Sequence, residues 1–145
     1  MLNCDLINST AILEVIKNIS PDYIYHLAGE SSVGLSWNSP QSLINNNITV
    51  SLNILEALRI LENTRTRILL ACSSEEYGHV PDKKIPITEV VPLRPVSPYA
   101  VTKATVDMFG YHYYKSYGMK IVRMRAFNHT SPRRDAIYAL SNFVK

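Results

Sequence analysis

Residues 67–72 form an almost uninterrupted apolar run, Arg-Ile-Leu-Leu-Ala-Cys, and four polar residues follow it at once. A strand that is apolar on both sides is typical of a parallel sheet with two covered faces, whereas antiparallel strands usually alternate apolar and polar side chains. In open parallel sheets, ligands bind outside the carboxyl ends of the strands. Ser73 and the residues after it are therefore predicted to lie where such a fold carries its site.

Three helices are predicted from capping residues that precede an apolar periodicity. The first begins at Ser9 or Thr10 and ends before residues 20–22. The second is a long helix that Ser39 caps, with Pro40 at its first position. The third follows Ser97-Pro98 and ends near Tyr117, with Gly118 as its C-cap.

Strand patterns alternate with these helices. Buried strands are predicted over 23–28 and 67–72, and a further strand over 120–125. The proline-rich segment 78–98 is predicted to be an extended surface loop. This order predicts an α/β fold: a doubly wound parallel sheet with right-handed crossovers and helices on both faces.

The composition argues against several other classes of protein. The 145 residues are 46% hydrophobic and carry a net charge of +3 without any basic cluster, so neither disorder nor a nucleic-acid partner is expected. Only two cysteines are present, and Cys72 lies in an apolar run, so neither a disulfide framework nor a metal site is indicated. These cysteines make a reducing cytoplasm the expected location. No apolar stretch approaches the roughly 18 residues of a membrane span, so no membrane partner is expected.

Tyr99 and Lys103 are four residues apart, a spacing that puts both side chains on one face of a helix. A tyrosine can act as a base near neutral pH when a cation lowers its pKa from about 10. A hydroxyl group such as that of Ser73 would hydrogen-bond the substrate oxygen while a nicotinamide exchanges hydride. The spacing alone is also compatible with an ordinary amphipathic helix that carries a partly buried tyrosine and a solvated lysine.

The strings Ser73-Ser74-Glu75-Glu76-Tyr77-Gly78 and Ser97-Pro98-Tyr99-Ala100-Val101-Thr102-Lys103 resemble the extended short-chain dehydrogenase/reductase family of nucleotide-sugar enzymes. With residues 127–134, Phe-Asn-His-Thr-Ser-Pro-Arg-Arg, they are most similar to the GDP-mannose 4,6-dehydratases and the GDP-4-keto-6-deoxymannose reductases. The resemblance extends over essentially the whole chain. It implies a partial Rossmann-like domain and an NAD(P)-dependent reaction on a nucleotide sugar.

By this resemblance, Tyr99 is the general base, Lys103 lowers its pKa and binds the nicotinamide ribose, and Ser73 orients the C4 hydroxyl of the sugar. Glu75 would take the proton from C5 and assist loss of the C6 hydroxyl, a step that a reductase does not require. At least one of Glu75 and Glu76 is expected to face the site. The alternative for this pair is a solvated acidic strand end.

The resemblance also implies cofactor contacts on several segments. Asn128 matches a substrate contact, and Asn47 resembles an asparagine near the active site. Glu30 and Ser42 depart from the dehydratases, which carry a glutamine and a tyrosine there. The implied cofactor-binding residues are Asp5, Leu6, Leu27, Ala28, Gly29, Glu30, Ser31, Lys103, His129 and Arg134.

The chain is expected to form only part of a domain. Residues 1–145 are interpreted as a partial NAD(P)-binding catalytic domain that lacks the glycine-rich N-terminal β-α-β unit and most of the C-terminal substrate-binding part. One hypothesis is an enzyme, either a GDP-mannose 4,6-dehydratase or a GDP-4-keto-6-deoxymannose reductase. The other is a non-catalytic remnant whose exposed sheet edge needs a partner.

The resemblance implies further partners. The expected cofactor is NADP, or NAD, with Arg134 favouring NADP through its fork of donors for a phosphate. A nucleotide sugar is the expected substrate. Members of the family pair through the long helix and the Tyr99 helix, which implies a homodimer or tetramer for the full-length protein. Tyr111, Tyr113, Tyr114 and Tyr117 are assigned either to that surface or to the core.

Overall fold

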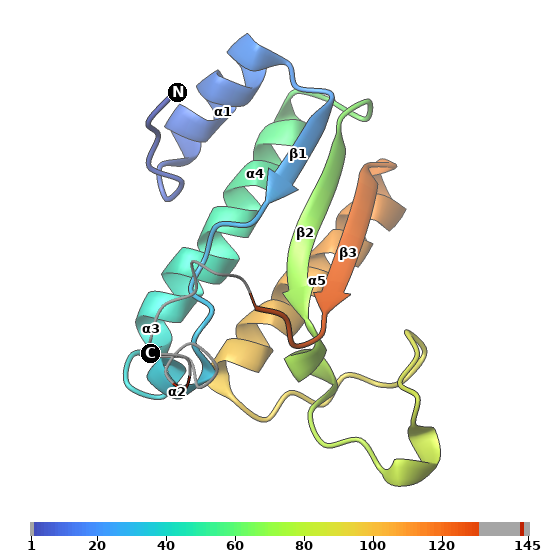
Figure 1. The fold of residues 1–145 in the computed structure, drawn as a ribbon. Helices are drawn as coiled ribbons and strands as arrows, with labels where there is room; N and C mark the ends of the chain where they lie inside the picture. The colour runs from blue at the N-terminus through green and yellow to red at the C-terminus, as the bar shows by residue number, and fades with distance from the viewer. Residues whose placement is uncertain (1, 131–142, 144–145) are drawn as a thin grey trace.

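A three-stranded parallel sheet organises the molecule (Figure 1). The structure is a computed structural model that describes residues 2–130 and residue 143. Strands β1 (Tyr23–His26), β2 (Arg67–Ser73) and β3 (Lys120–Ala126) lie side by side in that order. Tyr23 pairs with Arg67, and Arg67 with Lys120, so the carboxyl ends of all three strands point the same way. The predicted α/β fold with a parallel sheet is confirmed.

Helices α4 and α5 pack along one face of this sheet, and α1 packs against α4 (Figure 1). Helix α4 lies in the connection from β1 to β2, and α5 lies in the connection from β2 to β3. Connections between parallel strands usually contain such a helix. Within the described residues, the covering helices lie on this one face. The helical elements are α1 (Ser9–Ile19), α2 (Val33–Ser36), α3 (Pro40–Leu43), the π-helix η1 (Ile44–Thr49), α4 (Val50–Ile60), the 3₁₀ turns η2 (Ser74–Tyr77) and η3 (Asp82–Lys84), and α5 (Pro98–Tyr117).

The hydrophobic core fills the space between the sheet and the helices. Ile68 and Leu70 of β2 are buried against Leu55 and Leu58 of α4 and Val106 of α5. Alternate residues of a strand share one face, which explains why every second residue of β2 joins this core. A Cβ at Gly110 of α5 would lie 2.8 Å from Leu70 Cδ1, so glycine lets this helix approach the strand closely.

The other face of the sheet corrects one expectation. Tyr23 and Tyr25 are exposed, with Tyr25 at 69%, and Val122 and Met124 of β3 are exposed as well. The prediction of a buried strand at 23–28 is therefore wrong for Tyr23 and Tyr25, whereas His26 is buried. The strand also ends at His26, because the ladder with β2 stops there.

The helix ends follow local capping chemistry, with two differences from the predictions. Asn8, not Ser9 or Thr10, caps α1, because its extended backbone lets Oδ1 accept a hydrogen bond from the Ala11 N–H. Ser39 precedes Pro40 as predicted, but its side chain makes no capping hydrogen bond. The caps of α5 are confirmed. Ser97 Oγ accepts from the Ala100 N–H, and Gly118 adopts the left-handed conformation at the C-terminus.

The long helix predicted to begin at Pro40 runs without a break to Ile60, but its middle is a π-helix over Ile44–Thr49. Such segments shift the side chains that follow by about 100° around the axis and are frequent at functional sites. Three consecutive asparagines fall in this segment, and one of them, Asn47, is buried. Among residues 2–130 and 143, no helix has both the length and the apolar character needed to cross a bilayer.

Candidate active site

Ser73 is the last residue of β2, at the carboxyl edge of the sheet, and it caps the short turn that follows. Its Oγ accepts a hydrogen bond of 3.2 Å from the Glu75 N–H, and its own N–H donates to Glu76 Oε1 over 2.8 Å. Gly78 ends the turn at a φ of +61°, where a Cβ would lie 1.9 Å from the Arg94 carbonyl oxygen. The turn after β2 is therefore fixed at its start by the hydrogen bonds of Ser73 and at its end by the close approach of Gly78 to the loop.

Tyr99 and Lys103 occupy the first turns of α5, which packs on β2. The Lys103 ammonium donates a hydrogen bond of 2.7 Å to the Ala71 carbonyl oxygen and lies 5.9 Å from the centre of the Tyr99 ring. Burial lowers the pKa of Lys103, while the nearby Cys72 and Glu76 groups act to raise it. The arrangement puts a cation beside the phenol at the strand edge that carries Ser73.

The two carboxylates after Ser73 have different environments. Glu75 is exposed, whereas Glu76 is completely buried, at 0% exposure. The alternative of a solvated acidic pair is therefore wrong for Glu76. Burial raises the pKa of Glu76 to about 7, and the hydrogen bond from the Ser73 N–H opposes that shift. The exposed carboxylate of Glu75 is the one that is open to solvent at the strand end.

Five of the residues assigned to the cofactor come together from two segments of the chain. One pocket is lined by Asp5 and Leu6 from the N-terminal segment and by Ala28, Gly29 and Glu30 from the turn after β1. Leu27 is exposed beside them, and neither it nor Ser31 lines this pocket.

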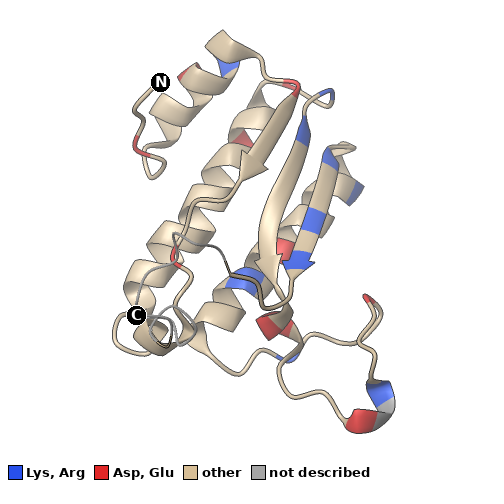
Figure 2. Ribbon diagram, viewed as in Figure 1, with Lys and Arg blue, Asp and Glu red and all other residues tan. Residues whose placement is uncertain are grey.

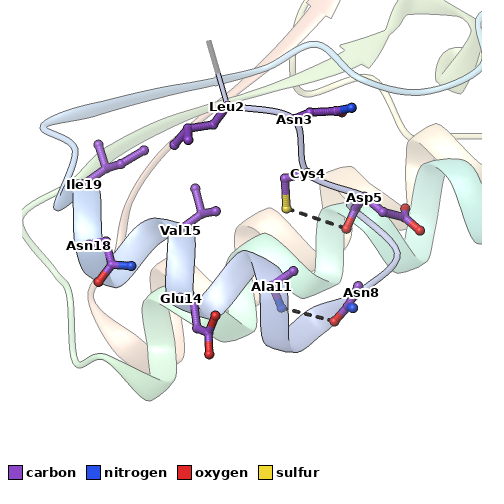
Figure 3. A pocket seen from close by; sticks show the side chains of 10 residues that line it. All are labelled: Leu2, Asn3, Cys4, Asp5, Asn8, Ala11, Glu14, Val15, Asn18 and Ile19. Atoms are coloured by element: carbon purple, nitrogen blue, oxygen red, sulfur yellow. Dashed lines mark hydrogen bonds between the residues drawn. The ribbon is translucent and has the colours of Figure 1, made fainter.

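A second hollow lies between the N-terminal segment and α1 (Figure 3). Figure 3 shows the Asn8 side chain at the start of that helix, bonded to Ala11, and the Cys4 thiol directed at the Asp5 carbonyl oxygen. Cys4 and Asp5 line both hollows.

Glu30 is held by side chains of the long helical segment. Its Oε1 accepts hydrogen bonds of 2.7 Å from the Ser42 hydroxyl and 2.6 Å from the Asn46 amide. The Asn46 amide also reaches the Ser42 hydroxyl over 3.1 Å. The carboxylate at position 30 is therefore locked between the turn after β1 and the α3 and η1 segments.

Asn47 joins this turn to α5. Its Oδ1 accepts from the Glu30 N–H over 2.8 Å, and its Nδ2 donates to the Glu30 carbonyl oxygen and to Thr102 Oγ1. The Thr102 hydroxyl in turn donates to the carbonyl oxygen of Tyr99. A Cβ at Gly29, which has a φ of +140°, would lie 2.5 Å from Asn47 Oδ1. The asparagine noted in the sequence thus links the turn assigned to the cofactor with the helix of Tyr99 and Lys103.

The C-terminal string is described only in part. Asn128 and His129 are exposed just beyond the carboxyl end of β3, and the His129 Nδ1 lies 2.9 Å from the Phe127 carbonyl oxygen. Both therefore share the edge of the sheet at which Ser73 lies. Arg134 lies outside the described residues.

The family follows from sequence comparison. The sequence profile of the family described as GDP-mannose 4,6 dehydratase matches residues 1–145, the whole chain. The chain belongs to the GDP-mannose 4,6-dehydratase family. It is 40% identical over 143 residues to the GDP-mannose 4,6-dehydratase of Yersinia enterocolitica and 37% identical over 142 residues to that of Vibrio cholerae. Each match covers 97% of this chain and 38% of the relative, so the chain spans well under half of either enzyme.

Solved structures with the same fold support this assignment. The structure of RMD from Pseudomonas aeruginosa complexed with NADPH matches with a TM-score of 0.88 and 26% identity, over 97% of this chain and 48% of that one. The UDP-glucose 4-epimerase of Thermus thermophilus in complex with NAD matches with a TM-score of 0.82 and 31% identity, over 92% and 42%. The predicted membership of the extended short-chain dehydrogenase/reductase family is confirmed.

The sequence did not reveal one cluster in this dehydratase-family chain. Asp107, on the buried side of α5, accepts bidentate hydrogen bonds from Arg125 and one of 2.6 Å from Arg123. These hydrogen bonds to Asp107 are the largest factor that raises the pKa of Arg125. Figure 2 shows the basic residues that recur along β3. Asp107 lies about two helical turns after Tyr99 and so on the same face of the helix. Its burial could have been predicted from that spacing.

Tyrosines of α5 divide between the two assignments left open by the sequence. Tyr113 is buried and donates a hydrogen bond to Glu56 of α4, whereas Tyr111, Tyr114 and Tyr117 are exposed. Burial, followed by the hydrogen bond to Glu56, raises the pKa of Tyr113. Of the four tyrosines left open by the sequence, Tyr113 therefore belongs to the core of this dehydratase-family chain and the other three to its surface.

Proposed function

We propose that this chain carries the proton-transfer site of an NAD(P)-dependent GDP-mannose 4,6-dehydratase. Such an enzyme oxidises the sugar at C4, eliminates water across C5 and C6, and reduces C6. The observation that supports this best is the Lys103 ammonium, which is fixed on the Ala71 carbonyl oxygen and lies beside Tyr99. The family match and the dehydratase relatives supply the substrate class.

The residues present fit a nicotinamide dinucleotide. A pocket joins Asp5 and Leu6 to the exposed backbone of Ala28 and Gly29, where the absence of bulky side chains would permit close approach. Leu27, Ser31, His129 and Arg134 complete the proposed contacts. Bound there, the nicotinamide would accept and return the hydride. The relatives with this fold include one complexed with NADPH and one with NAD, and the resemblance of Arg134 to a phosphate contact favours NADP.

The proton transfers fall to side chains of this chain. Tyr99 would take the proton of the C4 hydroxyl, and the charge of Lys103 would stabilise its phenolate. Ser73, fixed at the end of β2, would orient that hydroxyl. The exposed carboxylate of Glu75 would take the C5 proton once C4 is a ketone, and Asn128 would contact the substrate near its diphosphate.

A reductase acting on the 4-keto product is the second candidate. Ala100-Val101-Thr102 and the segment 113–118 support it, because they resemble the reductases. A reductase would use Ser73, Tyr99 and Lys103 in the same roles and would not need Glu75. The role of Glu75 therefore separates the two candidates.

A chimera tests the proposal directly. This chain would replace the matching 143 residues of the Yersinia enterocolitica dehydratase, and product mass would be followed with GDP-mannose and NADP. We expect loss of one water, abolished by Tyr99→Phe, with Glu75→Gln blocking elimination while cofactor binding persists. A chimera that leaves GDP-mannose unchanged but reduces supplied GDP-4-keto-6-deoxymannose with NADPH would favour the reductase. A folded chimera that binds NADP but performs neither reaction would contradict both.

Assembly and location are proposed from the same family. We expect a homodimer or tetramer in the cytoplasm that pairs through the long helical segment and α5. Exposed apolar side chains on α5 support such a surface: Val101, Met108, Tyr111 and Tyr114. Light scattering of the purified protein checks the oligomeric state.

A further inference from the structure

Glu76 is a buried acid to which the proposed reaction assigns no role. Its side chain is 0% exposed, and its Oε1 accepts the Ser73 N–H. Its Oε2 has no hydrogen-bond partner among the residues the structure describes. Buried carboxylate oxygens are normally satisfied, because removing them from water without a partner is unfavourable. An acid retained in this position therefore calls for an explanation.

The surroundings of Glu76 come from three elements of the fold. Polar atoms of Cys72 on β2, Glu76 on the turn and Asp107 on α5 all lie within 4.8 Å of one another. From β3, the Arg125 Nε lies 3.6 Å from Glu76 Oε2 and 2.9 Å from Asp107 Oδ2. The guanidinium thus faces both acids, and of these two acids it is Asp107 that accepts hydrogen bonds from it.

Arg125 also fixes the far side of the same turn. Its Nη1 donates to the Tyr77 hydroxyl over 3.0 Å and to the Glu89 carbonyl oxygen of the loop over 3.3 Å. The backbone carbonyl of Glu76 accepts a hydrogen bond of 2.9 Å from the Arg94 N–H in that loop. Strand, turn and loop therefore meet at Glu76.

We propose that Glu76 is a positioning residue, whose buried carboxyl group sets the conformation of the turn that presents Ser73 and Glu75. Glu76 Oε1 fixes the backbone of Ser73, and Ser73 Oγ fixes the backbone of Glu75. Loss of the first hydrogen bond frees the second. The catalytic roles of Ser73 and Glu75 rest on the proposed function, but this arrangement of the turn does not.

The proposal includes a dependence on pH. Burial brings the pKa of Glu76 to about 7, with Asp107 acting to raise it and Arg125 and Lys103 acting to lower it. Cys72, Tyr77 and Arg123 are the other titratable or charged groups around this cluster. An ionised Glu76 accepts a stronger hydrogen bond from the Ser73 N–H and attracts Arg125 away from Asp107. The turn therefore has two electrostatic states near neutral pH.

The test follows the backbone amide protons of Ser73 and Glu75 by NMR from pH 5 to pH 9. In the native protein, we expect both signals to titrate together with a midpoint near 7, the Ser73 proton moving downfield as Glu76 ionises. Glu76→Gln keeps the shape and the acceptor oxygen, so the protein should fold but the titration should be lost. Glu62→Gln changes an exposed acid and should leave the titration intact.

The outcome is independent of catalysis. A Ser73 amide that does not titrate, or that titrates unchanged in a folded Glu76→Gln protein, would overturn the proposal. So would Glu76→Ala if the Ser73 and Glu75 amide signals kept their native positions. Failure of the chimera to process GDP-mannose would count against the proposed function and leave these amide measurements unaffected.

Discussion

The Glu30 carboxylate accepts a hydrogen bond of 2.7 Å from the Ser42 hydroxyl, across the gap between the turn after β1 and α3. By the resemblance, these are two of the positions at which the sequence departs from the dehydratases, which carry a glutamine and a tyrosine there. A short hydroxyl donor and a charged acceptor form a close pair here, and Asn46 donates to the same oxygen. The two departures are therefore one coupled change in the wall of the proposed cofactor pocket.

Coupling between these residues is measurable by a double-mutant cycle of Glu30→Gln and Ser42→Ala. Because the acceptor is charged and partly buried, we expect a coupling free energy of about 1 to 2 kcal/mol. Urea unfolding of the native, single and double variants gives the value. A cycle of Glu62→Gln with Ser42→Ala is the control. Additive effects in the Glu30 cycle would show that the two side chains act separately.

Asn47 provides a second prediction. Asn47→Ala removes three hydrogen bonds of a buried side chain, and we expect it to lower the free energy of unfolding by about 3 kcal/mol. Asn45→Ala, two residues earlier and exposed, should cost less than about 0.5 kcal/mol. Denaturant unfolding of both variants makes the comparison. Equal losses of unfolding free energy in the two variants would mean that the hydrogen bonds of Asn47 do not stabilise the protein.

The sequence predicted those features of the fold that depend on neighbouring residues in the chain, such as helix ends and strands. Ser97 and Gly118 bound α5 because a capping hydroxyl and a left-handed glycine act within one turn. The strand at Lys120–Ala126 likewise follows from its own residues. The spacing of Tyr99 and Lys103 placed two site residues on one helix face without any knowledge of the sheet.

Features decided by distant neighbours were missed. Glu75 and Glu76 are identical side chains in adjacent positions. Glu76 is the buried one, and two of the groups that surround its carboxylate, Arg125 and Asp107, come from other elements. Tyr23 and Tyr25 resemble residues of a strand with two covered faces, but no described helix covers theirs. The π-helix was missed because three asparagines give no local signal for where a helix widens.

Asp107 provides a third prediction through the cost of an uncompensated buried charge. Asp107→Asn leaves Arg125 and Arg123 facing a neutral amide in a position with 1% exposure. We expect a loss of about 3 to 5 kcal/mol in the free energy of unfolding. Asp22→Asn removes an exposed pair with Arg65 at 3.7 Å and should cost less than about 1 kcal/mol. Thermal and urea unfolding would reveal the difference, and similar losses would contradict it.

His26, at the end of β1, provides the fourth prediction because it is buried with a fixed hydrogen bond. The Ser51 hydroxyl donates to the Asn47 carbonyl oxygen over 2.6 Å, so the His26 Nε2, 2.8 Å from Ser51 Oγ, carries the proton and donates. Burial, with a smaller effect of the Lys103 charge, lowers the pKa of His26 from 6.5 to about 4. Its imidazole is therefore neutral in the folded protein.

Between pH 6.5 and pH 4 the unfolded chain binds a proton at His26 that the folded protein does not, so this group makes stability fall as the pH falls. The shift corresponds to about 3 kcal/mol across that window. Glu76, with a pKa raised to about 7, acts in the opposite sense, because its stabilising contribution is lost as the pH rises from 4.5 to 7.

The two effects partly cancel in the native protein, so the measurement belongs in a Glu76→Gln background. There, urea unfolding should show a steep loss of stability towards pH 4 that His26→Gln removes and that His79→Gln, at an exposed position, leaves in place. A slope that survives His26→Gln would assign the acid sensitivity to another group.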